Sequence, residues 1–294
     1  MGLLDKFKGS SVNSKGVNFA DLGEYQEALE CFDKAVKLDS ERFEAWYNRA
    51  SALLNLERYE EALESFDKSL ELNSKDAMSW FKKGITLGEL GKQKEALESY
   101  NESLKWDSEN YEVWYNKGVT LVILGESQEA LKCFKEASEL NPNDPKSWYN
   151  YGLTLSNFER YHEALECYNN ALNIDVNYFK SWYNKGNIFK DLEKFEEAIK
   201  CYDEVLKLNP EHIGAWGNKG VAFNGLKRHS KALKCFNQVL KIDSNDIKGW
   251  YYKGYTLAKL GKEQEAIKCF DKALKIDPDY EDAKKAKEEL LSPM

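Results

Sequence analysis

The chain contains 294 residues, of which 42% are hydrophobic and 31% are charged, and its formal net charge is −8. This composition excludes a disordered chain, and the acidic balance argues against non-specific binding to nucleic acid or anionic lipid, because both need clustered lysine and arginine in excess. No stretch approaches the roughly 18 apolar residues of a membrane span and the start does not resemble a secretion signal, so we expect a soluble, cytoplasmic protein.

Residues 1–8, MGLLDKFK, form a leader ahead of a repeated pattern. We expect the apolar residues Leu3, Leu4 and Phe7 to cover the open end of the first repeat, and a weak contact with a membrane or a partner is the alternative. Gly2 suits N-myristoylation, but Lys6 stands where serine or threonine is needed.

Tryptophan reveals the period of the pattern, because it recurs every 34 residues. The positions are Trp46, Trp80, Trp114, Trp148, Trp182, Trp216 and Trp250. An alanine follows each tryptophan 16 residues later, an aromatic residue follows four residues beyond the alanine, and no insertion interrupts the register. An earlier copy carries Val12 in place of tryptophan. The eight copies are 9–42, 43–76, 77–110, 111–144, 145–178, 179–212, 213–246 and 247–280.

Each copy is predicted to form two antiparallel helices. Apolar and small residues recur at helical spacing in SWYNKGNIFKDL and again in EEAIKCYDEVLKL. A glycine such as Gly125 or Gly261 would end the first helix in the left-handed conformation. Gly186 in a first helix and Ala198 in a second would let the two backbones approach closely. Because one hairpin cannot bury its apolar face alone, the copies must stack.

The pattern W-x2-[L/K]-G-x2-[L/F] followed by A-x3-[F/Y], with proline at 142, 210 and 278, resembles the tetratricopeptide repeat family in its prokaryotic form. The resemblance covers more than nine-tenths of the chain. It implies an all-α fold, a right-handed superhelical α-solenoid of antiparallel helix pairs. The chain departs from the family pattern in two ways: it lacks the closing proline in five copies, and it carries lysine or arginine at repeat position 7 in seven.

After the last copy, residues 281–294 are predicted to form a C-terminal capping helix. The segment YEDAKKAKEELL is strongly helical, but Lys284 stands where the repeats place tryptophan. A polar outer face of this kind is expected at the end of a repeat array.

The cysteines follow the repeat, not a bonding pattern. Five of the six, from Cys133 to Cys269, are spaced 34 residues apart, and Cys31 lies three periods before Cys133. Neighbouring helices lie roughly 8 to 10 Å apart, whereas a disulfide needs Cα atoms within about 7 Å. We therefore expect small, reduced, buried side chains, with Ser65 and Ser99 in their place in two copies.

No combination of residues predicts an enzyme, a metal site or a cofactor. His162, His212 and His229 fall at different repeat positions and in no ligand spacing, so we expect them to be surface helix residues. Family members with an activity carry it outside the repeats, and here the repeats account for nearly the whole chain.

Asparagine at repeat position 6 is the candidate binding feature. It occurs in five copies, and Ser14, Lys82 and Tyr252 are the exceptions. The five are Asn48, Asn116, Asn150, Asn184 and Asn218. In the family this stripe of the first helix lines the concave surface of the superhelix. An amide offers both a donor and an acceptor, so a ladder of these residues would hold the backbone of an extended peptide.

Neighbouring repeat positions add chemistry to this ladder. Position 5 is aromatic in six copies, supplying stacking surface with a polar tip. These residues are Tyr47, Phe81, Tyr115, Tyr149, Tyr183 and Tyr251. Position 2 changes sign along the chain, from Glu44 and Glu112 to Lys146, Lys180 and Lys248, so the later half should favour acidic ligands.

Resemblance to chaperone-binding family members suggests a more specific site. Some of them hold a C-terminal carboxylate with lysine and asparagine side chains. Asn187, Asn218 and Lys248 match three of those positions, while Tyr183 and Tyr252 replace two basic residues.

The resulting prediction is a non-enzymatic scaffold that binds an extended or short helical segment of another protein along its concave groove. The alternative is an assembly element that self-associates through its ends or its convex face. RNA recognition, as in the pentatricopeptide relatives, is disfavoured by the acidic charge and the 34-residue period.

Overall fold

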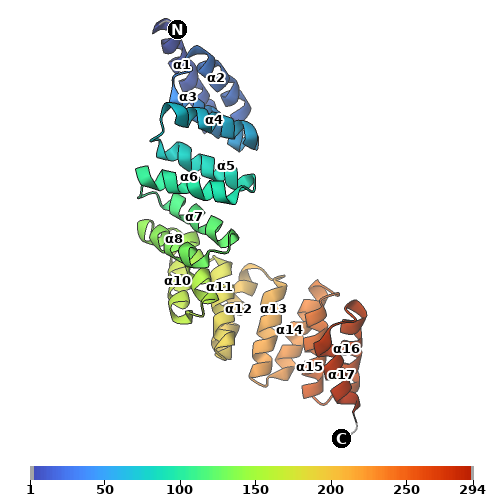
Figure 1. Ribbon diagram of the computed structural model, residues 1–294. Coiled ribbons are helices and arrows are strands. Elements are labelled where there is room, and N and C mark those ends of the chain that lie inside the picture. Colours follow the sequence, from blue (N-terminus) through green and yellow to red (C-terminus); the bar gives the residue numbers. More distant parts are fainter. Residues whose placement is uncertain (1–2, 293–294) are drawn as a thin grey trace. The chain divides into compact units, whose positions relative to one another are not determined.

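The computed structural model of the protein describes residues 3–292. Every regular element in this range is an α-helix, and the helices alternate as the first and second members of antiparallel pairs. They group into two compact units, residues 1–143 and residues 144–294 (Figure 1). The all-α prediction is confirmed.

The first unit contains four helix pairs. Their bounds are α1 Leu3–Asp21, α2 Tyr25–Leu38, α3 Phe43–Asn55, α4 Tyr59–Leu72, α5 Ala77–Glu89, α6 Gln93–Trp106, α7 Tyr111–Ile123 and α8 Ser127–Leu140. Helix α1 has 19 residues, whereas α3, α5 and α7 each have 13, because the leader continues into the helix of the first repeat.

The second unit contains four pairs and a final helix. Their bounds are α9 Pro145–Asn157, α10 Tyr161–Ile174, α11 Phe179–Asp191, α12 Phe195–Leu208, α13 Ile213–Gly225, α14 His229–Ile242, α15 Ile247–Lys259, α16 Glu263–Ile276 and α17 Glu281–Leu291. In α17, Ala283 is fully buried and Leu290 packs against the buried cluster of α15 and α16.

A glycine facing an aromatic ring sets the close approach within each pair. A Cβ atom placed on Gly186 in α11 would lie 2.7 Å from Cε1 of Tyr202 in α12, and the Tyr202 ring is fully buried. The equivalent distance from Gly84 to Tyr100 is 2.5 Å. Such distances are below van der Waals contact, so only glycine fits at this position. This confirms the packing role expected for Gly186.

The turn inside each pair is left-handed at one position. Gly125 and Gly261 have φ angles of 82° and 75°, which confirms the helix ends expected there. Four copies adopt the same conformation without glycine. They are Glu57, Glu159, Glu193 and Lys227, with φ between 56° and 58°.

The repeated tryptophan joins one repeat to the loop before it. The indole Nε1 of Trp182 donates a hydrogen bond of 2.9 Å to the carbonyl oxygen of Val176, six residues earlier. The same bond forms at Trp46, Trp80, Trp114, Trp216 and Trp250. The tryptophan therefore fixes the connection between repeats as well as filling space.

Lysine at repeat position 7 has a structural role that the sequence left unexplained. The Nζ atom of Lys83 lies 5.1 Å from the ring centroid of Trp80 in the same helix. It also lies 2.7 Å from Oδ1 of Asp67, which belongs to the second helix of the preceding repeat. Lys219 pairs in the same way with Trp216 and with Asp203. The position-7 lysine thus links adjacent repeats through a ring and a carboxylate.

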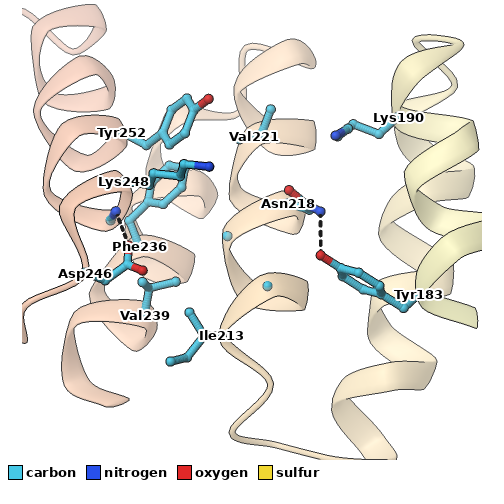
Figure 2. A pocket seen from close by; sticks show the side chains of 13 residues that line it. Tyr183, Lys190, Ile213, Asn218, Val221, Phe236, Val239, Asp246, Lys248 and Tyr252 are labelled. Atoms are coloured by element: carbon cyan, nitrogen blue, oxygen red, sulfur yellow. Dashed lines mark hydrogen bonds between the residues drawn. The ribbon is translucent and has the colours of Figure 1, made fainter. Parts of the chain in front are cut away.

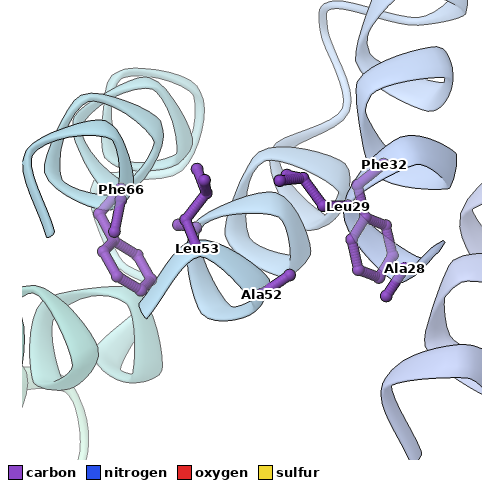
Figure 3. Close-up of a cluster of buried hydrophobic side chains, with 8 residues drawn as sticks. Ala28, Leu29, Phe32, Ala52, Leu53 and Phe66 are labelled. Atoms are coloured by element: carbon purple, nitrogen blue, oxygen red, sulfur yellow. The ribbon is translucent and has the colours of Figure 1, made fainter. Parts of the chain in front are cut away.

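Alanine and aromatic side chains fill the core between helices. In one cluster of the first unit, Phe32 of α2 and Phe66 of α4 lie on either side of Leu53 of α3 (Figure 3). Ala28 and Ala52 complete this cluster, and none of these side chains is more than 2% exposed. The alanines keep the helices close while the rings fill the remaining volume.

All six cysteines are reduced and buried, as predicted. Burial raises the pKa of the Cys133, Cys201 and Cys235 thiols to about 11. Ser65 and Ser99, at the same repeat position, are also buried.

The predictions for the leader and the histidines need correction. The Phe7 side chain is 78% exposed, so it does not cover the first repeat, and the side chains of Leu3 and Leu4 lie outside the described residues. His212 is not a helix surface residue: it precedes α13, and its Nδ1 accepts a 3.0 Å hydrogen bond from the Ala215 N–H. A histidine nitrogen can cap a helix as a carboxylate does, which the sequence pattern did not reveal. Within residues 3–292, no helix is long and apolar enough to cross a lipid bilayer.

Candidate functional site

Most of the predicted binding residues lie on the first helices of the second unit. We call the side chains at repeat positions 2, 5, 6 and 9 of α9, α11, α13 and α15 the first-helix face. Each of these helices presents these positions at i, i+3, i+4 and i+7, so they share one side of the helix. Asn48, Asn116 and Tyr115 occupy the corresponding positions in the first unit.

Three of the five predicted asparagines connect neighbouring repeats. In each, the side-chain nitrogen donates to the residue 35 positions earlier, at position 5 of the preceding repeat. Asn48 donates to Oδ1 of Asn13 at 3.1 Å. Asn184 donates to the Tyr149 hydroxyl at 3.1 Å, and Asn218 donates to the Tyr183 hydroxyl at 3.2 Å. This tie between positions 6 and 5 was not foreseen from the sequence.

Asn116 and Asn150 make a different hydrogen bond. The nitrogen of Asn116 donates to the Glu112 carbonyl oxygen at 2.8 Å, and the nitrogen of Asn150 donates to the Lys146 carbonyl oxygen at 2.9 Å. For Asn116 the cause is clear, because position 5 of the preceding repeat is Phe81, which has no polar atom. All five asparagines are half-buried, neither locked in the core nor fully solvated.

Asn187 belongs to a network on the same face. Its Oδ1 accepts hydrogen bonds of 2.9 Å from the Tyr202 hydroxyl and 2.9 Å from the Asn218 nitrogen. Asn218 therefore uses its nitrogen for Tyr183 and Asn187. In Figure 2 the Asn218 nitrogen faces Tyr183 and its oxygen points away from that ring. The carbonyl oxygen is the atom that Asn218 presents to a ligand, instead of the donor and acceptor together.

A pocket of about 360 Å³ opens on the first-helix face, around α13 (Figure 2). Tyr183 of α11 lies on one side, Lys248 and Tyr252 of α15 lie on the other, and Asn218 of α13 lies between them. The structure thus brings together three of the predicted binding residues, Tyr183, Asn218 and Lys248. Asn187 does not line this pocket.

Apolar side chains and glycines form the inner surface of the pocket. Phe236 and Val239 of α14 are almost fully buried, at 1% and 2% exposure, and reach the pocket from behind α13. Gly214 and Gly217 lie where the other repeats carry larger side chains. A Cβ atom on Gly217 would meet no atom within 4 Å. The space is therefore left by the sequence and is not closed by a neighbour.

Positive charge lies on this face. Lys146, Lys180 and Lys248 are all exposed, and none of the three takes part in an ion pair with another residue of the described range. Lys190, also in the pocket, lies 3.2 Å from Asp191. Exposed amines without a carboxylate partner remain available for an acidic ligand.

The aromatic residues at position 5 are held by rings of the second helices. Tyr149 lies 6.1 Å from Tyr168, and Tyr183 lies 6.1 Å from Tyr202, between ring centroids. In the first unit Tyr115 lies 5.9 Å from Phe134. Burial raises the pKa of the Tyr149 hydroxyl, and the hydrogen bond from Asn184 partly offsets this effect. These hydroxyls therefore stay protonated near neutral pH.

Sequence reasoning missed the residues that create the pocket. Gly214, Gly217 and Asp246 drew no attention because they interrupt the repeat pattern instead of following it. The available signal was the copy from 213 to 246, which is the one copy after the first without an aromatic residue at position 5. Among residues 3–292, no cluster of histidine, cysteine and acidic side chains has the arrangement of a metal site.

Comparisons with known proteins agree with this architecture. Family models of the tetratricopeptide repeat match residues 14–77, 65–98 and 133–166, and the four segments 111–144, 179–212, 214–246 and 247–280. No curated protein matches the sequence.

Solved structures share the fold. YrrB, described as a TPR protein with an unusual peptide-binding site, is 29% identical, with a TM-score of 0.58 over 64% of this chain and 96% of YrrB. MamA from Desulfovibrio magneticus RS-1 is 22% identical, with a TM-score of 0.55 over 58% of this chain and 96% of MamA.

A tetratricopeptide repeat protein from Parabacteroides merdae ATCC 43184 is 16% identical, with a TM-score of 0.59 over 85% of this chain and 99% of that protein. The last two comparisons, at low identity, concern the fold alone. With the 34-residue helix pairs and the matches along both units, the chain belongs to the tetratricopeptide repeat family, an α-solenoid scaffold for interactions between proteins.

Proposed function

We propose that the first-helix face of the second unit binds an extended or short helical acidic segment of another protein, without catalysis. The observation that carries this proposal is the pocket that gathers Tyr183, Asn218 and Lys248. It combines a carbonyl acceptor for a peptide N–H, an exposed ammonium group and an apolar surface, which are the groups that hold a peptide in a groove.

Two further observations support the proposal. The exposed amines of Lys146, Lys180 and Lys248 recur every repeat or every second repeat along the face, so an acidic segment could contact several of them. The similarity to YrrB, which has a peptide-binding site, favours peptide recognition by this fold. The asparagines at position 6 contribute mainly through their oxygen atoms, because their nitrogens already hold the repeats together.

The test begins with a random-sequence peptide library, selected on the full chain. We expect acidic peptides to be enriched. Substituting Lys146, Lys180 and Lys248 with glutamate should then weaken the selected peptides at least about tenfold, since each ion pair in a shielded groove contributes a few tenths to one kcal/mol or more. Fluorescence anisotropy with labelled peptides measures the loss.

The chain offers a matched control. Lys200, Lys234 and Lys268 occupy one position of the second helices α12, α14 and α16, are equally exposed and lie at the same 34-residue spacing. Substituting these three with glutamate makes the same change in net charge on another surface. Equal weakening by both triple variants, or a library without enrichment, would refute peptide binding by this face.

A further inference from the structure

Two aromatic rings meet at three of the four repeats in the second unit. The ring at position 5 contacts a ring at position 34 of the same repeat, just before the next first helix. Tyr149 lies 5.4 Å from Tyr178, Tyr183 lies 4.8 Å from His212, and Tyr251 lies 5.5 Å from Tyr280, between centroids. This pair fills the space between consecutive first helices.

The repeat from 213 to 246 lacks both rings. Gly217 stands at position 5 and Asp246 at position 34, and both line the pocket. The direction of the missing ring follows from the preceding repeat, where the Tyr183 hydroxyl lies 2.7 Å from a Cβ placed on Gly214 at position 2 of the next repeat. A tyrosine at 217 would point in the same way toward Lys248, so the pocket occupies the volume of the absent ring.

Tyr252 takes up only part of this space. It stands at position 6, where five other repeats carry asparagine, and its ring stacks on Phe236 at 5.6 Å with an interplanar angle of 13°. Tyr252 therefore shields the face of Phe236 that a position-5 ring covers elsewhere. The pocket remains beside it, lined by both rings.

We propose that this pocket receives an aromatic side chain of the bound peptide, flanked by acidic residues. This inference rests on the proposed function and adds the side chain that gives it specificity. The ligand ring replaces the missing pair and packs against Phe236, Val239 and Val221. Burying one aromatic side chain in a preformed apolar pocket contributes strongly to specificity.

Charge complementarity defines the flanking residues. The ammonium groups of Lys190 and Lys248 lie toward the upper part of the pocket in Figure 2, whereas Asp246 lies below. The Oδ1 atom of Asp246 accepts a hydrogen bond from the Gly249 N–H and caps α15, so this carboxylate is already engaged. A carboxylate next to the ligand ring would meet Lys248 and avoid Asp246.

The experiment compares two nine-residue peptides, one with phenylalanine at its centre and two aspartates on each side, and its twin with central alanine. On the full chain, the phenylalanine peptide should bind about tenfold more tightly by fluorescence anisotropy. Gly217→Tyr restores the residue type that other repeats carry and fills the pocket. This variant should abolish the preference, whereas Gly217→Ser, which leaves most of the space open, should keep it.

Lys248→Gln should reduce binding of the phenylalanine peptide about threefold to tenfold, and Lys234→Gln on α14 should change it less than twofold. Circular dichroism and a melting curve establish whether each variant is folded. If Gly217→Tyr does not fold, backbone amide shifts on the parent chain decide: the phenylalanine peptide, but not its twin, should move the Gly214 and Gly217 signals.

Three outcomes overturn the pocket proposal: no binding of either peptide, equal binding of the two, or a preference that persists in folded Gly217→Tyr. Equal shifts of the glycine signals with both peptides do the same. The first-helix face would still stand as a peptide site if library-selected acidic peptides bound to it and lost affinity in the triple lysine variant, so the two failures are distinguishable.

Discussion

Asparagine at position 6 holds adjacent repeats together before it can contact any ligand. Asn218 gives its nitrogen to Tyr183 and Asn187, which leaves its oxygen for a peptide. Replacing Asn218 with alanine would remove a part of the fold along with the acceptor, because half-buried groups would lose their partners. The exposed lysines give a cleaner test of binding, since their removal leaves these hydrogen bonds intact.

Position 7 gives a stability prediction at the scale of one residue. Lys83 is 21% exposed and combines a ring contact with Trp80 and an ion pair with Asp67 of the preceding repeat. We expect Lys83→Met to lower the free energy of unfolding by about 1 kcal/mol, because it removes both electrostatic contacts and retains most of the apolar stem. Urea unfolding of the full chain measures the change.

Lys68 supplies the control for this prediction. It forms an exposed ion pair of 2.6 Å with Glu71 on the same helix, and both side chains are more than half exposed. Lys68→Met should cost less than about 0.5 kcal/mol. Equal losses in the two variants would show that the contact between repeats adds nothing beyond a surface ion pair.

The helix pair is the element from which both units are built, and its period predicted it well. Tryptophan, glycine and alanine at fixed spacing indicated the two helices, their close contact and the glycine turns. The turns at Glu159 and Lys227 were not predictable in this way, because these residues rarely adopt positive φ. They do so here because the helices on both sides determine the turn.

Two glycines of α5 separate close packing from helix propensity. A Cβ on Gly84 would lie 2.5 Å from Cε1 of Tyr100, whereas a Cβ on Gly88 would meet nothing within 4 Å. We expect Gly84→Ala to destabilise the chain by about 1 to 3 kcal/mol through overpacking. Gly88→Ala should stabilise it by about 0.5 to 1 kcal/mol through better helix propensity.

Thermal or urea unfolding of both α5 variants checks these signs. Both substitutions add one methyl group to the same helix, so any difference reflects the surroundings of each site. Destabilisation by Gly88→Ala as large as that by Gly84→Ala would contradict the packing described for the glycine and the facing ring.

At the scale of the whole molecule, buried thiols predict how stability changes with pH. Burial raises the pKa of Cys133, Cys201 and Cys235 to about 11, above the roughly 8.5 of an exposed thiol. A raised pKa in the folded state means that the native chain holds these protons more tightly than the unfolded chain. This contribution to stability is complete below about pH 8 and is lost as the pH rises toward 11.

The urea midpoint should therefore stay level between pH 7 and 8 and fall by pH 9.5. A thiol reagent at pH 8 provides an independent check, because all six cysteines are buried and should react slowly in the native chain and fast in urea. Fast reaction without urea, or a midpoint that rises toward pH 9.5, would contradict the burial of the second helices.

The sequence predicted the repeat fold over nearly its full length, but not the division into two units. The repeat pattern passes residue 144 without an insertion, so nothing in it marks where one unit ends. The candidate site was predictable in part: the period placed Tyr183, Asn218 and Lys248 on one side of the first helices. The pocket itself depends on residues that are absent from the pattern, such as Gly217, and on side chains of α14 behind them.

The measurement that tests the central claim most directly is a map of backbone amide shifts on the full chain as a selected acidic peptide is added. We predict that the largest changes fall in α11, α13 and α15, including Gly214, Gly217 and Lys248. Changes concentrated instead in α12, α14 and α16 near Lys200, Lys234 and Lys268 would contradict peptide binding by the first-helix face.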